Sequence, residues 1–184
     1  MGTERMAPSE EALMPTSDIP VTGIAGIAGL PLHQVGILVQ DLEIAVARYS
    51  AFWGMKWQLW TYDDQNVPRL EYRGAPGHFQ MRIALSLTEP QLELIQPTRG
   101  PSLYHEWTTE GRFGLHHVGI RVPDLSSACA ALEGVGLVPL QAGAGHGLDG
   151  DGGFAYFDTL DWLGVYVELI EPPKRRREPE STYP

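Results

Sequence analysis

Four polar side chains interrupt otherwise apolar segments at positions where they could share one chemical task. They are Gln34, Glu93, His117 and Glu168. In a β-strand the apolar neighbours of each residue point to the opposite face, so the four polar side chains need partners of their own. Two carboxylates, one imidazole and one amide oxygen suit Zn, Ni, Co, Mn or Fe, so we predict a divalent metal site.

A repeat within the chain favours a shared site over four separate ones. Residues 33–42, HQVGILVQDL, match residues 116–125, HHVGIRVPDL, which places Gln34 opposite His117. Residues 92–97, LELIQP, match residues 167–172, VELIEP, which places Glu93 opposite Glu168. Agreement at both ends indicates a duplicated module, and pseudo-symmetric packing of the two copies would bring the four side chains into one concave site.

The competing interpretation needs no metal. Glu93 and Glu168 could each meet water at an open strand edge, with His117 hydrogen-bonded in the core. His116 and His33 neighbour the candidate ligands along the chain. Strand alternation places each of them on the face opposite its neighbour, so we expect neither to bind the ion.

The apolar patterns predict the same element order, β-α-β-β-β, in both modules. The first has strands over 32–39, 55–60, 79–87 and 91–96, a helix over 42–52, and a short strand over 70–72 that forms a hairpin with 79–87. The second has strands over 115–122, 137–141, 154–159 and 164–170, with a helix over 125–132. Asp41 is the expected N-cap of the first helix and Gly54 its expected end.

These elements divide the chain into five parts. Residues 1–30, rich in Pro and Gly, are predicted to be a flexible arm, and residues 31–97 form the first module. Residues 98–113 are a linker with a short helix over 102–108, and residues 114–172 form the second module. Residues 173–184 are predicted to be a disordered tail whose basic run, 174–177, lies in solvent.

Composition excludes several classes of function. The net charge of −10 argues against a general affinity for nucleic acid or an anionic membrane. A hydrophobic content of 43% is ordinary for a globular protein. Cys129 is the single cysteine, so no internal disulfide can form. Since no apolar run reaches a membrane span of about 18 residues and the first residues lack a secretory core, we expect a cytoplasmic protein.

The sequence resembles the vicinal oxygen chelate superfamily, which includes glyoxalase I, methylmalonyl-CoA epimerase, extradiol dioxygenases and bleomycin- or fosfomycin-resistance proteins. The resemblance covers residues 32–172. It is carried by residues 114–120, GLHHVGI, with Val-Pro-Asp at 122–124, and by the two Glu-Leu-Ile strand ends. It implies an α+β fold in which two tandem βαβββ modules form a U-shaped mixed sheet around a central cavity. Superfamily members build their sites within one chain or across a dimer, so a homodimer is among the expected assemblies.

The resemblance carries the candidate ligands over one at a time. His117 stands where the superfamily has a histidine ligand, Glu168 at the last-strand glutamate, and Glu93 at the corresponding place in the first module. Gln34 stands where many members have histidine and eukaryotic glyoxalase I has glutamine. Residues 90–97 and 102–117 look more like the methylmalonyl-CoA epimerase branch. Residues 158–164, DTLDWLG, replace a shorter turn of the glyoxalases, which weakens a glyoxalase assignment.

The function implied is that of an isomerase, an epimerase or a glyoxalase-type lyase acting on a small molecule with a carbonyl or paired oxygens. Glu168 or Glu93 would remove a proton α to the carbonyl, and the metal would stabilise the enolate. Arg121 is predicted to meet an anionic group of the substrate. The aromatic residues predicted to line the cavity are Trp57, Trp60, Tyr62, Phe79, Tyr104, Trp107, Phe154 and Tyr156.

Two rival functions remain open at this point. An extradiol-type Fe(II) dioxygenase would need two histidines and one carboxylate, and Gln34 breaks that triad. A metal-free member could sequester a hydrophobic antibiotic, or could act as a biosynthetic cyclase or isomerase through its cavity alone. The glutamine at the first ligand position and the many aromatic residues both leave room for this second alternative.

Overall fold

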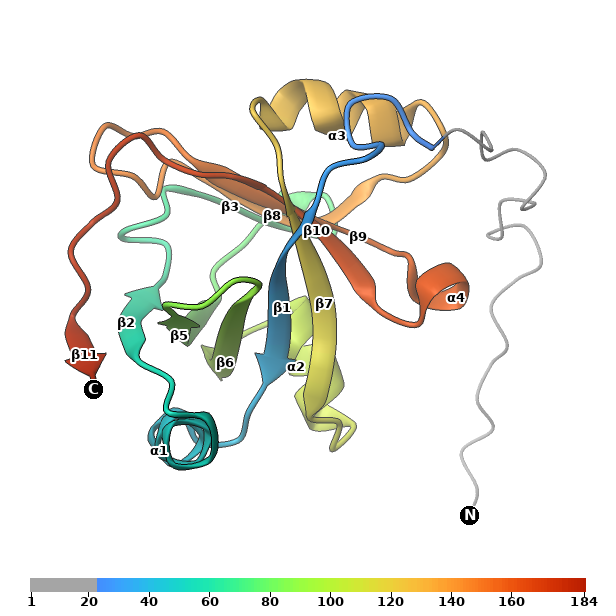
Figure 1. The fold of residues 1–184 in the computed structure, drawn as a ribbon. Coiled ribbons are helices and arrows are strands. Elements are labelled where there is room, and N and C mark those ends of the chain that lie inside the picture. The colour runs from blue at the N-terminus through green and yellow to red at the C-terminus, as the bar shows by residue number, and fades with distance from the viewer. Residues whose placement is uncertain (1–22) are drawn as a thin grey trace, which may run out of the picture.

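The computed structural model describes residues 23–184, so most of the arm predicted over residues 1–30 lies outside the described residues. One mixed sheet runs through the described part of the chain and is strongly curved (Figure 1). Its spatial order is β11-β2-β5-β6-β1-β7-β10-β9-β8-β3-β4. The strands are β1 (Leu32–Leu38), β2 (Trp57–Tyr62), β3 (Arg69–Tyr72), β4 (Ala75–Pro76), β5 (Gln80–Ser86), β6 (Gln91–Arg99), β7 (Gly114–Arg121), β8 (Pro139–Ala144), β9 (Gly153–Phe157), β10 (Tyr166–Glu171) and β11 (Ser181–Tyr183).

The two modules join at the middle of this sheet. The first contributes β2, β5, β6 and β1, and the second contributes β7, β10, β9 and β8. In each module the first strand is parallel to the last, β1 to β6 and β7 to β10, while β1 and β7 are antiparallel to each other. This arrangement confirms the predicted α+β fold of two tandem βαβββ units in a U-shaped mixed sheet.

The first three helices match the predicted ranges to within one residue at each end, whereas the fourth was not predicted. They are α1 (Leu42–Trp53), α2 (Leu103–Thr109), α3 (Leu125–Glu133) and α4 (Leu160–Leu163). The Asp41 carboxylate accepts a hydrogen bond from the Ile44 backbone N–H at 2.8 Å, and Asp124 caps α3 in the same way. Gly54 follows α1 with a φ of 67°, a left-handed conformation that favours glycine.

Three apolar clusters fill the two faces of the sheet. On the outer face Leu42 and Val46 of α1 pack with Trp57 of β2, and α3 covers the second module through Ala128 and Leu132. The two helices lie at opposite ends of the molecule, each beside its own module (Figure 1). The largest cluster occupies the inner face, where α2 contributes Leu103, Tyr104 and Trp107.

The predicted hairpin between residues 70–72 and 79–87 is wrong. The short strand β3 leaves its own module and pairs with β8 of the second, with Leu70 opposite Gly143. Arg73 and Gly74 both have positive φ and turn the chain back into β4 instead of into β5. Gly143 makes room for this pairing, because a Cβ there would lie 3.2 Å from Leu70 and 2.4 Å from Phe154.

The prediction of a disordered tail is also wrong. Residues 173–180, which we call the strap, leave the end of β10 and cross the molecule to β2, where residues 181–183 add β11 to the sheet (Figure 1). The strap is fastened at several points. The Trp60 indole N–H donates to the Arg177 carbonyl at 3.1 Å, and the Glu180 carboxylate accepts from the Thr61 N–H at 2.9 Å and its hydroxyl at 3.0 Å.

No helix in residues 23–184 is long and apolar enough to cross a membrane.

Candidate metal centre

Strand register brings the predicted ligands to the middle of the sheet. Gly36 of β1 lies between Glu93 of β6 and His117 of β7. Gly119 of β7 lies between Gln34 of β1 and Glu168 of β10. The pattern is the same in both modules because the repeat places a small residue two positions after each amide or imidazole.

The two glycines leave the space that the ligands occupy. A Cβ on Gly36 would lie only 1.8 Å from Cε1 of the His117 ring. A Cβ on Gly119 would lie 2.9 Å from Cβ of Gln34 and 2.8 Å from Cδ1 of Ile170. The glycine in each Val-Gly-Ile segment therefore has a steric role, since any side chain would displace a candidate ligand.

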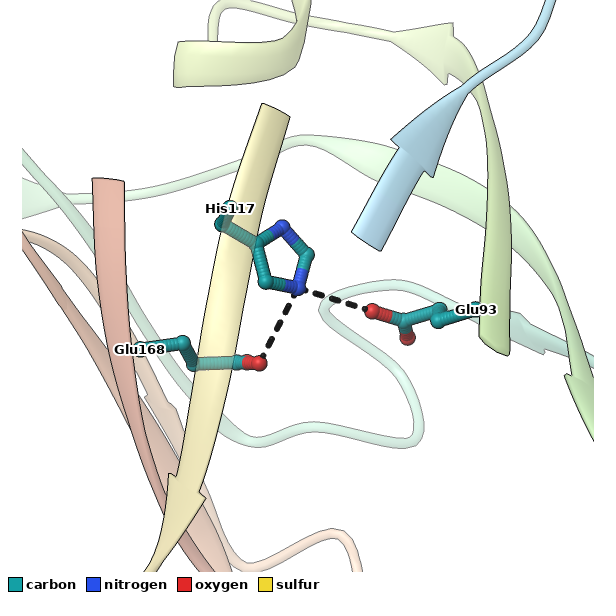
Figure 2. A group of neighbouring side chains, drawn as sticks. All are labelled: Glu93, His117 and Glu168. Carbon is teal, nitrogen blue, oxygen red and sulfur yellow. Dashed lines mark ion pairs between the residues drawn. The ribbon is translucent and has the colours of Figure 1, made fainter. Parts of the chain in front are cut away.

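Glu93, His117 and Glu168 form a tight cluster (Figure 2). The His117 Nε2 lies 3.2 Å from Oε2 of Glu93 and 3.2 Å from Oε2 of Glu168. All three residues are buried, with exposed fractions of 8% for Glu93, 0% for His117 and 5% for Glu168. The two modules thus each contribute one glutamate to the same buried cluster.

The chemistry of this cluster fits a metal ion. These same three atoms, His117 Nε2 and the two Oε2 atoms, are buried and lack a hydrogen bond of acceptable geometry. Buried polar atoms without such a partner are costly in a folded protein. Candidate ligand atoms of the three residues lie within 4.8 Å of one another, so one ion could contact all of them. Gln34 lines the same cavity and makes only a long contact of 3.5 Å with Gln91.

The electrostatics of the cluster couple its members. Burial raises the pKa of Glu93, with a further contribution from the negative charge of Glu168. Burial alone would lower the pKa of His117, but the two carboxylates outweigh it and raise that pKa to about 9. A site this rich in negative charge attracts a cation, whether a proton on His117 or a metal ion in its place.

Comparison with known proteins decides the family. Residues 33–157 match the family model described as the Glyoxalase/Bleomycin resistance protein/Dioxygenase superfamily. The chain belongs to this superfamily. The match spans most of both modules and includes three of the four candidate ligands.

Several solved structures share the fold of this chain. A methylmalonyl-CoA epimerase from Mycobacterium tuberculosis is 23% identical, with a TM-score of 0.57 over 84% of this chain and 92% of that chain. A hypothetical protein from Bacillus halodurans is 17% identical, with a TM-score of 0.57 over 82% of this chain and 99% of the other. A variant of the Streptomyces coelicolor methylmalonyl-CoA epimerase, bound to 2-nitronate-propionyl-CoA, is 18% identical with a TM-score of 0.56 over 80% and 98%.

In this superfamily member a second histidine, His116, lies beside the centre, although strand alternation predicts that it faces the other side of the sheet. Gly36 pairs with His117 but Ile37 pairs with Leu115, so His116 is an extra residue in β7 with no partner on β1. Such a β-bulge breaks the alternation and turns both imidazoles to the same side. The His116 Nδ1 consequently lies 3.1 Å from the His117 Nδ1. The expectation that the two histidines face opposite sides is therefore corrected.

Of the aromatic residues predicted to line the cavity, only Tyr62 and Phe154 do so, and most of the others are buried in the inner cluster. Phe79, Tyr104, Trp107 and Tyr156 belong to the inner cluster, and the ring centroids of His117 and Tyr156 are 5.0 Å apart. Trp60, Tyr62 and Phe154 belong to the same cluster. Trp57 is misplaced, because it packs on the outer face against α1 and donates to the Ser50 hydroxyl at 3.0 Å.

Sequence reasoning missed two residues that border the centre. The cavity beside the cluster has a volume of about 50 Å³ and is lined in part by Gln34, Glu93, Glu168, Tyr62, His146 and Arg176. Arg121, the predicted anion-binding residue, is exposed at the end of β7 and does not line this cavity. Arg176 lies in the segment predicted to be a disordered tail, and no local sequence signal ties Arg176 or His146 to the centre.

Proposed function

We propose that this superfamily member is a metal-dependent enzyme that removes a proton α to a carbonyl, as an isomerase or an epimerase does. The observation that supports this most directly is the pair of buried carboxylates that face one imidazole nitrogen at 3.2 Å. One protonated imidazole cannot neutralise two carboxylates, whereas a divalent cation can. The similarity to methylmalonyl-CoA epimerases, itself evidence for the fold alone, is consistent with this class of reaction.

In this proposal some residues would bind the ion and others would accept the proton. Glu93, His117 and Glu168 would hold the ion, and Gln34, on the same cavity wall, would offer its amide oxygen. When bound, the ion would stabilise negative charge on a substrate oxygen. Glu93 and Glu168 are the carboxylates placed to accept the proton from the substrate carbon. Burial of the cavity keeps bulk water away from the carbon while it lacks its proton.

The first test is elemental analysis of the purified chain beside His117→Ala and Glu168→Ala. We expect about one transition metal per chain in the wild type and a loss of metal in both variants. His78→Ala is the matched control, because His78 is an exposed histidine whose side chain is 75% accessible. Its metal content should equal that of the wild type. A wild type that holds no metal after reloading with zinc, nickel, cobalt, manganese and iron(II) would refute the metal assignment.

The second test measures exchange of the substrate's α proton with deuterium from the solvent. The loaded protein is incubated in deuterated water with a panel of 2-oxo acids and acyl thioesters, and deuterium at the α carbon is read by proton NMR. We expect exchange in the wild type and a loss of at least about a hundredfold in whichever of Glu93→Gln and Glu168→Gln removes the base. Equal exchange in both variants and the wild type would refute the assignment of a glutamate base.

A metal-free cavity protein is the second candidate, and one observation favours it. The pKa of His117 is raised to about 9, so an imidazolium can occupy the place of the ion and pair with both carboxylates. Such a protein would bind or convert its ligand through the cavity alone. Deuterium exchange that persists after thorough chelation would select this candidate over the metalloenzyme.

A further inference from the structure

The strap places Arg176 beside the centre, and hydrogen bonds to the residues before and after Arg176 fix the backbone there. The Leu148 N–H donates to the Arg175 carbonyl at 2.9 Å, and the Trp60 indole donates to the Arg177 carbonyl at 3.1 Å. Arg176 lies between these two fastened residues. The backbone on either side of Arg176 is therefore fixed to the loop after β8 and to β2.

Of the three consecutive arginines in the strap, only the middle one reaches the cavity. Arg175 and Arg177 are exposed, and the Arg175 guanidinium pairs with Asp149 through Nε at 2.9 Å. Arg176 is half-buried and lines the cavity beside Glu93 and Glu168.

The Arg176 guanidinium lies near an aromatic ring but, among the described residues, forms no ion pair with a carboxylate. Its Cζ lies 5.4 Å from the Trp60 ring centroid, a cation–π distance. Among residues 23–184, no carboxylate lies within ion-pair distance of it, although five other arginines have such a partner. A half-buried arginine held against a cavity without a counter-ion can bind an anion that enters it.

The charge of Arg176 reaches the rest of the cavity. Burial lowers the pKa of His146 to about 4, and Arg176 contributes to that lowering. Without Arg176 the cavity wall would present two carboxylates to any incoming anion. The arginine therefore offsets a repulsion that would otherwise exclude negatively charged ligands.

From these contacts we infer that Arg176 is an anion-binding residue that selects small substrates bearing a carboxylate next to the reactive carbonyl. This inference rests on the proposed function, because it assigns a substrate class to the same centre. The planar guanidinium can donate two parallel N–H groups to the two oxygens of a carboxylate. The cavity between Arg176 and the two carboxylates has a volume of only about 50 Å³, which disfavours a bulky ligand.

The test compares pyruvate with its neutral amide, pyruvamide, by isothermal titration calorimetry on the full chain. We expect the wild type to bind pyruvate more tightly than pyruvamide. Arg176→Gln should weaken pyruvate binding roughly 10- to 100-fold, the usual loss for a charged hydrogen bond, and leave pyruvamide unchanged. A wild type without preference for pyruvate would overturn the inference.

The neighbouring arginine supplies the control. Arg175→Gln removes the same charge from the same strap, but its side chain pairs with Asp149 outside the cavity. Its affinity for pyruvate should stay within about twofold of the wild type, since screened surface charges contribute little. Equal weakening by the two substitutions would show a general charge effect and overturn the inference, as would weakened pyruvamide binding in Arg176→Gln.

A third variant tests whether Arg176→Gln weakens binding only because it loosens the strap. Arg176→Lys keeps the charge beside Trp60 but loses the fork that fits a carboxylate, so its pyruvate affinity should lie between those of the wild type and Arg176→Gln. Absence of any pyruvate preference in this variant would count against the anion site. Metal content is measured on every sample first. Arginine-dependent pyruvate binding in a chain without metal would retain the anion site and refute only the metal assignment.

Discussion

The Nδ1 atoms of His116 and His117 lie 3.1 Å apart, within hydrogen-bond distance. When His117 holds an ion through Nε2, or carries protons on both ring nitrogens, its Nδ1 bears a proton and donates it to His116. Burial lowers the pKa of His116 well below its ordinary value, with a further contribution from His117, which keeps His116 neutral and able to accept. His116 thus fixes the tautomer and the ring orientation of the candidate ligand.

We predict that His116→Phe weakens metal binding roughly 10- to 100-fold, the usual effect of losing such a supporting contact. Phenylalanine keeps an aromatic ring among Tyr104, Trp107 and Tyr166 but offers no acceptor. Competition with a coloured zinc chelator measures the affinity. His78→Asn, which removes an exposed imidazole, should bind zinc like the wild type. Unchanged affinity in His116→Phe would mean that His117 needs no such support.

Gly36→Ala should disrupt the centre through steric contact. The new methyl group would meet the His117 ring at 1.8 Å, so the ring must leave its place. We expect a loss of about 1–3 kcal/mol in the free energy of unfolding, typical of overpacking, together with loss of metal. Urea denaturation and elemental analysis measure the two effects.

The control for this substitution is Gly54→Ala at the end of α1. A Cβ at Gly54 would meet nothing within 4 Å, but the backbone there has a φ of 67°, which costs an alanine stability. Gly54→Ala should therefore lower stability and retain metal. Retained metal in Gly36→Ala as well would contradict the steric role of Gly36.

Zinc should raise the stability of the wild type in proportion to its affinity. A ligand that binds only the folded chain adds about 2.7 kcal/mol at a free concentration of one hundred times its Kd. We expect the thermal midpoint to rise with zinc concentration in the wild type and to stay constant in Glu93→Ala and His117→Ala. Differential scanning calorimetry measures the midpoint, and an equal rise in all three proteins would indicate binding elsewhere.

His146 should make the protein less stable in mild acid. Burial holds its pKa at about 4 in the folded chain against 6.5 in the unfolded chain, so only the unfolded chain binds a proton between these values. Above about pH 6.5 His146 is neutral in both states and does not lower the free energy of unfolding. As the pH falls to about 4, the free energy of unfolding decreases by roughly 3 kcal/mol. The free energy of unfolding of His146→Asn should lack this decline. His78→Asn, an exposed control, should retain it.

The sequence by itself determined the duplicated architecture and the convergence of the candidate ligands. The repeat aligned Glu93 with Glu168 and Gln34 with His117, and strand periodicity gave both glutamates their face of the sheet. The helix ends at Asp41 and Gly54 were also readable, because capping depends on residues close along the chain.

Tertiary structure alone decided the rest. The bulge at His116 depends on the register between β1 and β7, and the pairing of β3 with β8 depends on an open edge in the other module. Arg176 reaches the cavity because the strap is fastened to β2 by residues more than a hundred positions away. Local patterns report contacts between near neighbours, whereas these three features arise where distant segments meet, so no local pattern encodes them.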